Sequence, residues 1–178
     1  KYQKILLITS KNIKRSFVFK GLKVIRIDPL KTSKEYNHFV IYKLHSFITT
    51  THILLVQWDG FVINNEKWND NFYNYDYIGA PFIPRENDNS YCRDRNGNFY
   101  CIGNGGFSLR SLRLLKSASK YKLEDDLNFT FCHEDGFFCV LHREFLESKG
   151  FKWAPYNIAT EFAIESPISI DRIFDLPF

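Results

Sequence analysis

The segment Ile53–Gly60, which reads Ile-Leu-Leu-Val-Gln-Trp-Asp-Gly, decides the predicted fold. Its first four residues are all apolar, as expected of a short strand that is buried in a sheet. A polar end follows directly, with Gln57, Trp58 and Asp59 before the turn-forming Gly60. Because α/β proteins bind ligands beyond the carboxyl ends of their strands, this strand end is the first candidate site.

The segments before this strand predict an α/β protein. Lys4–Thr9 is a β-branched apolar run and Leu22–Ile27 alternates in polarity, so both are predicted strands. Ser33 is placed to cap a helix that runs to about Thr49, with apolar residues at helical spacing. Strand, strand, helix and strand in this order open an α/β sheet with helices packed against it.

The segments after this strand predict shorter elements within one domain, residues 1–178. The irregular parts are a linker over Pro84–Asn98 and the C-terminal end. The regular elements are a helix over Glu66–Tyr75, strands over Asp76–Gly79 and Phe107–Leu109, a helix capped by Ser111 that runs through Lys120, and a helix over Glu134–Ser148 with Gly150 just past its end.

The dipeptide Asn96-Gly97 predicts a small hairpin insertion near residues 90–101, because it favours a two-residue type I′ turn. Such a turn pairs Cys92 with Cys101 at a non-hydrogen-bonded position, where a disulfide is feasible in an oxidising compartment. The first ten residues hold too short an apolar run for a signal peptide, so we favour free thiols. The four cysteines show no Cys-x-x-Cys spacing, so a structural zinc site is not expected.

Composition and charge narrow the class of protein. The aromatic share of 17% argues against disorder, and no run reaches the ~18 apolar residues of a membrane span. Residues 1–50 hold 11 Lys/Arg but only two acids, Asp28 and Glu35. This basic segment can meet nucleotide phosphates or an anionic membrane, or it can be a solvated face. We expect a cytoplasmic protein without a nucleic-acid partner and leave peripheral membrane contact open.

Two further segments hold residues that can act with Asp59. Gly103–Arg110 reads Gly-Asn-Gly-Gly-Phe-Ser-Leu-Arg, and its glycines let the backbone approach a ligand closely or take positive φ. It has neither the Gly-Lys-Ser/Thr of a P-loop nor the spacing of a dinucleotide fingerprint. Glu134 and Asp135 open a predicted helix, where either acid can take a proton from an attacking hydroxyl.

Each of these features also has a purely structural interpretation. Asp59 can cap the turn before Gly60, the glycines can form a plain turn, and the two acids can interact with the dipole of their helix. The order along the chain favours a functional interpretation: an acidic strand end, then a glycine-rich turn, then an acidic pair.

The ordered set resembles a family of bacterial and viral glycosyltransferase-like domains, and more distantly the GT-A-fold fringe-like and β-1,4-galactosyltransferase groups. The matching segments are Tyr36-Asn37, Ile53–Val62, Tyr75–Pro81 (YDYIGAP), Gly103–Arg110 (GNGGFSLR), Glu134-Asp135 and Ala159–Glu165. The resemblance implies a GT-A-like mixed sheet flanked by helices. It also implies a hexosyltransferase-like enzyme of glycan or surface polysaccharide synthesis, with a nucleotide-sugar donor that is UDP-linked and a glycan acceptor.

The resemblance also implies roles for the candidate residues. Asp59 matches the last acid of an Asp-x-Asp motif, which binds the donor diphosphate through a divalent cation, Mn²⁺ or Mg²⁺. Gly105 and Gly106 match the turn at the donor sugar, and Asp135 matches the base of an inverting transfer. The remaining expected contacts are Glu134 at the acceptor or beside Asp135, and Gln57, Trp58, Asn104 and Arg110 at the donor.

One departure from the pattern leaves an alternative open. Gln57 stands where the first Asp of the motif would be, so metal affinity should be lower or metal dependence lost. The chain can therefore also be a non-catalytic carbohydrate-binding or pseudoenzyme module, and a two-carboxylate glycosidase ranks below both. Trp58 and Trp153 are candidate platforms for a sugar ring, and the oligomeric state is not predicted.

Overall fold

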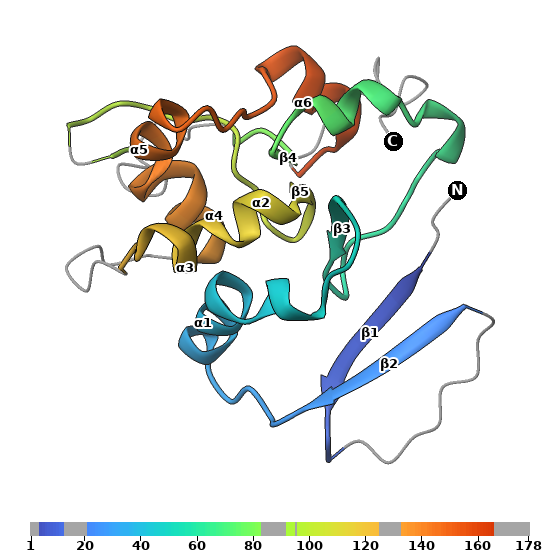
Figure 1. The fold of residues 1–178 in the computed structure, drawn as a ribbon. Coiled ribbons are helices and arrows are strands. Elements are labelled where there is room, and N and C mark those ends of the chain that lie inside the picture. Colours follow the sequence, from blue (N-terminus) through green and yellow to red (C-terminus); the bar gives the residue numbers. More distant parts are fainter. Residues whose placement is uncertain (1–3, 13–20, 83–91, 95, 125–132, 166–178) are drawn as a thin grey trace. The chain divides into compact units, whose positions relative to one another are not determined.

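The computed structural model of the chain describes residues 4–12, 21–82, 92–94, 96–124 and 133–165. They belong to two compact units, Lys1–Asn37 and His38–Phe178. Both units contain strands and helical residues, which confirms the α/β class (Figure 1). We predicted a single domain over residues 1–178. The division into two compact units does not test this prediction. No helix among the described residues has the length and apolar character needed to cross a membrane.

The first unit contains a parallel pair of strands, β1 (Ile5–Ser10) and β2 (Leu22–Ile27). Their register runs without a break from the first residue of each strand to the last. Both predicted strands are confirmed, and β2 has the predicted bounds. An exposed ion pair between Lys11 and Asp28, 3.1 Å from Nζ to Oδ1, joins the residues that follow the two strands.

Helix α1 (Ser33–Tyr42) is capped by Thr32, one residue before the predicted cap. The Thr32 hydroxyl accepts a hydrogen bond from the Glu35 amide at 3.2 Å, and the Thr32 carbonyl accepts the bond from Tyr36. Ser33 is therefore the first helical residue. The predicted end at Thr49 is also wrong, because a 3₁₀ turn, η1 (Leu44–Phe47), takes over after Tyr42.

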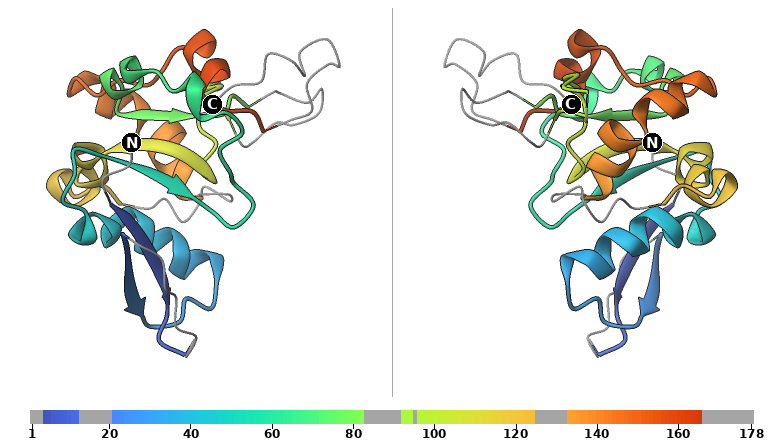
Figure 2. Two further views of the ribbon diagram at one scale, coloured as in Figure 1. Left: turned by 90° about the vertical axis from the view of Figure 1, so that its right-hand side faces the viewer. Right: turned by 90° about the vertical axis from the view of Figure 1, so that its left-hand side faces the viewer.

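The second unit is built on a three-stranded antiparallel sheet in the order β3-β5-β4 (Figure 2). The strands are β3 (His52–Val56), β5 (Phe107–Ser111) and β4 (Tyr77–Gly79). The middle strand β5 is buried from its second residue to its last, as expected of a strand paired on both edges. Parallel and antiparallel pairing thus occur in separate small sheets, and a GT-A sheet stays a prediction.

The segment between β3 and β4 forms two 3₁₀ turns in place of the predicted helix over Glu66–Tyr75. They are η2 (Asn65–Lys67) and η3 (Asp70–Asn74). The side chains of Asn64 and Asn69 each accept a hydrogen bond from the backbone amide two residues later. Such local bonds compete with helix formation and explain the two short turns.

Ser111 ends β5 and caps the helical segment that follows, as predicted: its hydroxyl accepts a bond from the Leu114 amide at 3.1 Å. Two short helices follow in place of the one predicted, α2 (Leu112–Leu115) and α3 (Ser117–Tyr121).

The predicted helix over Glu134–Ser148 is divided into three parts. α4 (Glu134–Gly136) continues into a π-helical turn over Phe137–Leu141, and α5 (Arg143–Ser148) follows. A bond from the His142 amide to the Phe137 carbonyl, five residues back, marks the π-helical turn. Such turns occur frequently at functional sites, and this one lies directly after the candidate acids.

The C-terminal part of the described chain contains a helix that the sequence did not predict, α6 (Tyr156–Phe162). Its buried residues Ala159 and Phe162 are three positions apart, so they share one face of the helix. Residues 166–178 lie outside the described part of the chain.

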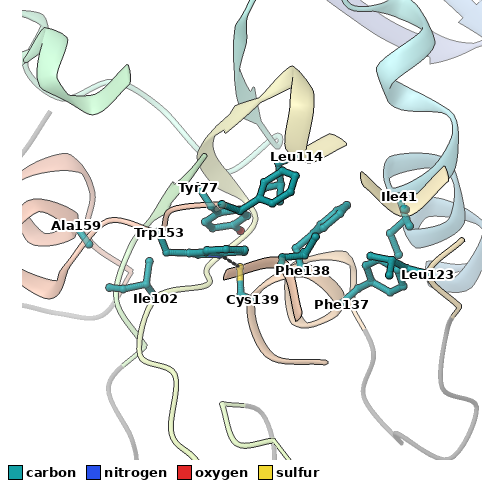
Figure 3. Packing of buried hydrophobic residues seen from close by; sticks show 13 residues of the cluster. Ile41, Tyr77, Ile102, Leu114, Leu123, Phe137, Phe138, Cys139, Trp153 and Ala159 are labelled. Carbon is teal, nitrogen blue, oxygen red and sulfur yellow. Dashed lines mark hydrogen bonds between the residues drawn. The ribbon is translucent and has the colours of Figure 1, made fainter. Parts of the chain in front are cut away.

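The main core cluster surrounds Tyr77 and Trp153 (Figure 3). The indole Nε1 of Trp153 donates a hydrogen bond to the Cys139 sulfur at 3.3 Å, and the guanidinium of Arg143 lies 4.1 Å from the Trp153 ring. Only 6% of Trp153 is exposed, so its prediction as a sugar platform is wrong. Burial raises the pKa of the Cys139 thiol to about 12, consistent with a structural thiol.

The hairpin insertion is present, but its register differs from the prediction by one residue. Arg93 pairs with Phe99, and the Gly97 amide donates to the Asp94 carbonyl at 3.1 Å. Gly97 has a φ of 83°, which fits a turn followed by a bulge. The shift removes Cys92 from its predicted position opposite Cys101, and the two cysteines do not form a disulfide, as we favoured. Much of the predicted linker lies outside the described residues.

A substitution at Gly150 tests the observed end of α5. Gly150 has a φ of 80° and completes a Schellman motif, in which the Phe151 amide donates to the Leu146 carbonyl. Gly150→Ala should destabilise the protein by about 1 kcal/mol, because a Cβ is disfavoured at positive φ. Gly150→Asn should cost less, because Asn tolerates this conformation better. Urea denaturation measures both, and an alanine variant as stable as the parent would contradict this account.

Candidate functional site

The candidate site is built around a glycine-rich turn over residues 103–106, here called the glycine turn, which leads into β5. The hydroxyl of Tyr77, on the neighbouring strand β4, lies 3.1 Å from the Gly103 carbonyl oxygen and 2.9 Å from that of Asn104. Full burial raises the pKa of Tyr77 well above its ordinary value, so the hydroxyl keeps its proton and donates to these carbonyls.

The other two carbonyls of the glycine turn are also bonded to the protein. Arg110 Nη2 and Ser108 Oγ donate to the Gly105 carbonyl at 3.2 and 3.0 Å. The Gln57 amide, just past the end of β3, donates to the Gly106 carbonyl at 2.8 Å. Donors on β4, on β5 and directly after β3 therefore fix four successive carbonyls of this turn.

Close contacts explain why glycines occupy the turn and the strand beside it. A Cβ on Gly79 would lie 2.1 Å from the carbonyl oxygen of Asn104, and one on Gly105 would lie 2.7 Å from Glu134 Oε1. Neither glycine has a positive φ. The sequence left positive φ and close approach as alternatives for the glycines of the turn, and close approach, here to the protein itself, explains Gly105.

Beneath the glycine turn lies a buried ion pair between Arg110 of β5 and Glu134 of α4. Arg110 Nη2 is 2.8 Å from Glu134 Oε1, and neither side chain is more than 4% exposed. The guanidinium also donates from Nε to Ser108 Oγ at 2.9 Å and lies 5.0 Å from the centre of the Tyr77 ring. Two opposite charges can be buried in a protein only when they pair closely and form further hydrogen bonds, as these do. Arg110, predicted at the donor diphosphate, instead lies inside the protein.

The candidate base, Asp135, lies on the first turn of α4 beside Glu134. Its Oδ1 accepts a hydrogen bond from the Gly136 amide at 2.7 Å, and only 6% of the residue is exposed. His133 precedes the two acids as the N-terminal cap residue of α4 and is exposed. The ion pair of Glu134 thus fixes the first turn of α4, on which Asp135 lies.

The acidic strand end lies against the opposite side of the glycine turn. Gln57 bonds to Gly106, and a Cβ on Gly60 would lie 3.3 Å from the Gly106 carbonyl oxygen. Between these two residues, Trp58 is 95% exposed and Asp59 is also exposed. The exposure of Trp58 allows the predicted sugar platform, and the carboxylate of Asp59 is accessible to a ligand.

The structure brings together the three segments that the sequence singled out. Gln57 contacts Gly106, and Glu134 lies against Gly105, so the glycine turn joins the strand end to the acidic pair. Tyr77 and Ser108, which hold this turn, were not predicted as site residues. The available signal was a tyrosine in an otherwise apolar strand, whose hydroxyl needs a partner when buried.

A third buried acid, Asp76, lies directly before β4 and was also missed. Its carboxylate accepts bonds from Ser111, Arg113 and the Lys152 amide. Burial opposes ionisation of Asp76, but these hydrogen bonds outweigh it and hold the pKa of the carboxyl below its ordinary range. We interpret this fully bonded acid as structural, joining β4 to β5 and to the residues before Trp153.

The described residues contain no group of three or more His, Cys, Asp or Glu side chains that could hold a metal ion. A cation at Asp59 would therefore need oxygen ligands from a bound diphosphate or water. Mg²⁺ is commonly bound in this way, by one or two carboxylates and substrate phosphates.

These features define an α/β protein in which a buried ion pair supports a glycine-rich turn between two acidic segments. The chain belongs to the family described as "Protein of unknown function (DUF5672)", which matches residues 21–176. Neither the curated proteins nor the solved structures yield a match.

A pair of glycine substitutions tests the closeness of the glycine turn to the ion pair. Gly105→Ala should destabilise the protein by about 1–3 kcal/mol, because its Cβ meets the buried Glu134 carboxylate. Gly106→Ala is the matched control, because its nearest contact is the flexible end of Gln57 at 3.3 Å. Urea denaturation compares them. Equal losses of stability in the two variants would contradict the arrangement described here.

Proposed function

We propose that the chain is a glycosyltransferase that moves a sugar from a nucleotide-diphosphate donor to an acceptor hydroxyl with inversion, in glycan or surface polysaccharide synthesis. The observation that supports this most is the meeting of the strand end, the glycine turn and the acidic pair. A GT-A-like fold and a place in the cytoplasm, with or without peripheral membrane contact, belong to the same proposal.

On the donor side, Asp59 contacts the nucleotide part of a UDP-linked sugar. Its exposed carboxylate can hold Mn²⁺ or Mg²⁺ against the diphosphate oxygens, or it can accept hydrogen bonds from the ribose. Gln57 supplies no second negative charge, so metal affinity should be low. Its backbone amide is bonded to Gly106, and the strand end is thereby fixed beside the glycine turn.

The donor sugar lies against Gly105 and Gly106 in this proposal. Gly106 is partly exposed and has no side chain, so sugar hydroxyls can approach its backbone closely. Gly105 is buried, and Glu134 occupies the space where its side chain would be. The carbonyls of both residues are bonded within the protein, which keeps the backbone fixed before a ligand arrives. Trp58 is the candidate platform for a sugar ring, and Asn104 bonds through Oδ1 to the Gly106 amide and supports the turn.

In the transfer itself, the Asp135 carboxylate takes the proton from the acceptor hydroxyl. The acceptor oxygen forms a bond to the anomeric carbon while the bond from that carbon to the diphosphate oxygen breaks. The electron pair leaves with the nucleoside diphosphate. A cation at Asp59 offsets the charge on this leaving group. Because Arg110 is buried and paired, we no longer assign it to this task.

A non-catalytic carbohydrate-binding module is the second candidate. Two observations favour it: Gln57 replaces the first acid of the motif, and Asp135 is mostly buried. A module would bind a glycan or nucleotide sugar without turnover, and loss of Asp135 would leave that binding unchanged. An enzyme would lose turnover in Asp135→Asn, since the amide cannot accept the proton.

Nucleotide binding tests the donor site. We would titrate the protein with UDP, GDP and CMP, with and without Mn²⁺, and follow its thermal midpoint. A ligand that binds only the folded state at ~100 times its Kd stabilises by about 2.7 kcal/mol. UDP should raise the midpoint, and Asp59→Ala should reduce this shift. Glu66→Ala is the matched control, because Glu66 is another exposed acid of the segment after β3.

The outcomes separate the candidate functions. No shift with any nucleotide, or equal shifts in the Asp59 and Glu66 variants, would contradict the proposed donor site. A UDP shift that depends on Asp59, without turnover of UDP-sugars toward any glycan tested, would favour the binding module.

A further inference from the structure

The Arg110 guanidinium contacts both parts of the proposed site at once. From Nη2 it donates to Glu134 Oε1 at 2.8 Å and to the Gly105 carbonyl at 3.2 Å. Its Nε donates to Ser108 Oγ, which itself donates to the Gly105 carbonyl at 3.0 Å. One planar side chain thus joins the turn assigned to the donor sugar to the helix that carries the candidate base.

The three hydrogen bonds of Arg110 need donors in fixed directions, which a positive charge alone does not provide. Arginine presents donors in a fixed planar fork, whereas a lysine ammonium is a compact charge on a flexible stem. Replacing a buried ion pair by apolar residues of similar volume is often neutral or stabilising. Such a pair need not add to stability, whereas its hydrogen bonds here join two separate segments.

We propose that the Arg110–Glu134 pair is a positioning clamp, which holds the glycine turn and the first turn of α4 in one fixed arrangement. The positioning role in catalysis rests on the proposed function, with the donor sugar at Gly105-Gly106 and Asp135 as base. Arg110 touches neither substrate nor reacting atoms, since it is fully buried. It is a positioning residue, and a misplacement of about 1 Å at reacting groups can slow a reaction by about 100-fold.

Hydrogen exchange tests the clamp without any donor or acceptor. In Arg110→Lys, exchange should become faster at the amides of residues 103–106 and of residues 134–137 together, although 28 residues separate Gly106 from Glu134 in the sequence. Arg113→Lys is the matched control, because Arg113 also pairs with a buried acid, Asp76, but none of its bonds reaches the glycine turn. The control should leave exchange at both segments unchanged.

Kinetics test what the clamp does. Arg110→Lys should lower kcat by about 100-fold and leave the Kd of UDP unchanged, because Arg110 does not contact the nucleotide. Weaker binding of UDP in this variant would instead indicate that Arg110 contacts the donor diphosphate, and it would overturn the proposal. Asp59→Ala gives the opposite pattern for comparison, with weaker UDP binding.

If Arg110→Lys does not fold, the paired variant Arg110→Met/Glu134→Leu replaces it, because it leaves no buried charge unpaired. The paired variant should fold and show the same faster exchange at both segments. Unchanged exchange at residues 103–106 in a folded variant overturns the clamp. Absence of turnover in the parent protein contradicts the proposed function instead, and the exchange result still supports or overturns the clamp.

Discussion

The second unit depends on one constraint: a guanidinium that is completely removed from water must find its partners within the protein. Arg110 meets this constraint at Nε and Nη2, which donate to a hydroxyl, a carboxylate and a backbone carbonyl. An unpaired charge at this depth would cost several kcal/mol, so these partners must keep their places. Glu134 is thereby fixed at the start of α4, and Gly105 is fixed at the entrance to β5.

The glycine at position 105 of this turn follows from the same constraint. A backbone that lies this close to a buried carboxylate leaves no room for a Cβ at Gly105, and the Asn104 carbonyl of the turn leaves none at Gly79 of β4. The turn is therefore preorganised, with its carbonyls bonded to Tyr77, Arg110 and other donors. A preorganised backbone is what a proposed sugar site needs, because binding then loses little conformational freedom.

Much of the fold could be predicted from sequence pattern, and the failures have local causes. β2 and β3 are confirmed because polarity and β-branching report directly on strands. The sequence predicted one helix over Glu134–Ser148 and not its division into three parts, because apolar spacing does not reveal a π-helical turn. The hairpin register shifted because Asn96 lacks the positive φ that a type I′ turn requires at both central residues, and Gly97 alone takes it, within a bulge. For the site, chain order predicted which segments meet, but not that Arg110 is buried, because an arginine beside glycines also fits a phosphate site.

The central claim is that the glycine turn is where a donor sugar lies. The most direct test is to follow the amide signals of Gly105 and Gly106 by NMR while UDP, and then a panel of UDP-linked sugars, is added to the full chain. The account predicts that a UDP-linked sugar shifts these two signals more than UDP does, whereas UDP alone mainly affects residues around Asp59. Saturable binding of a UDP-linked sugar that leaves both glycine signals in place would contradict the account.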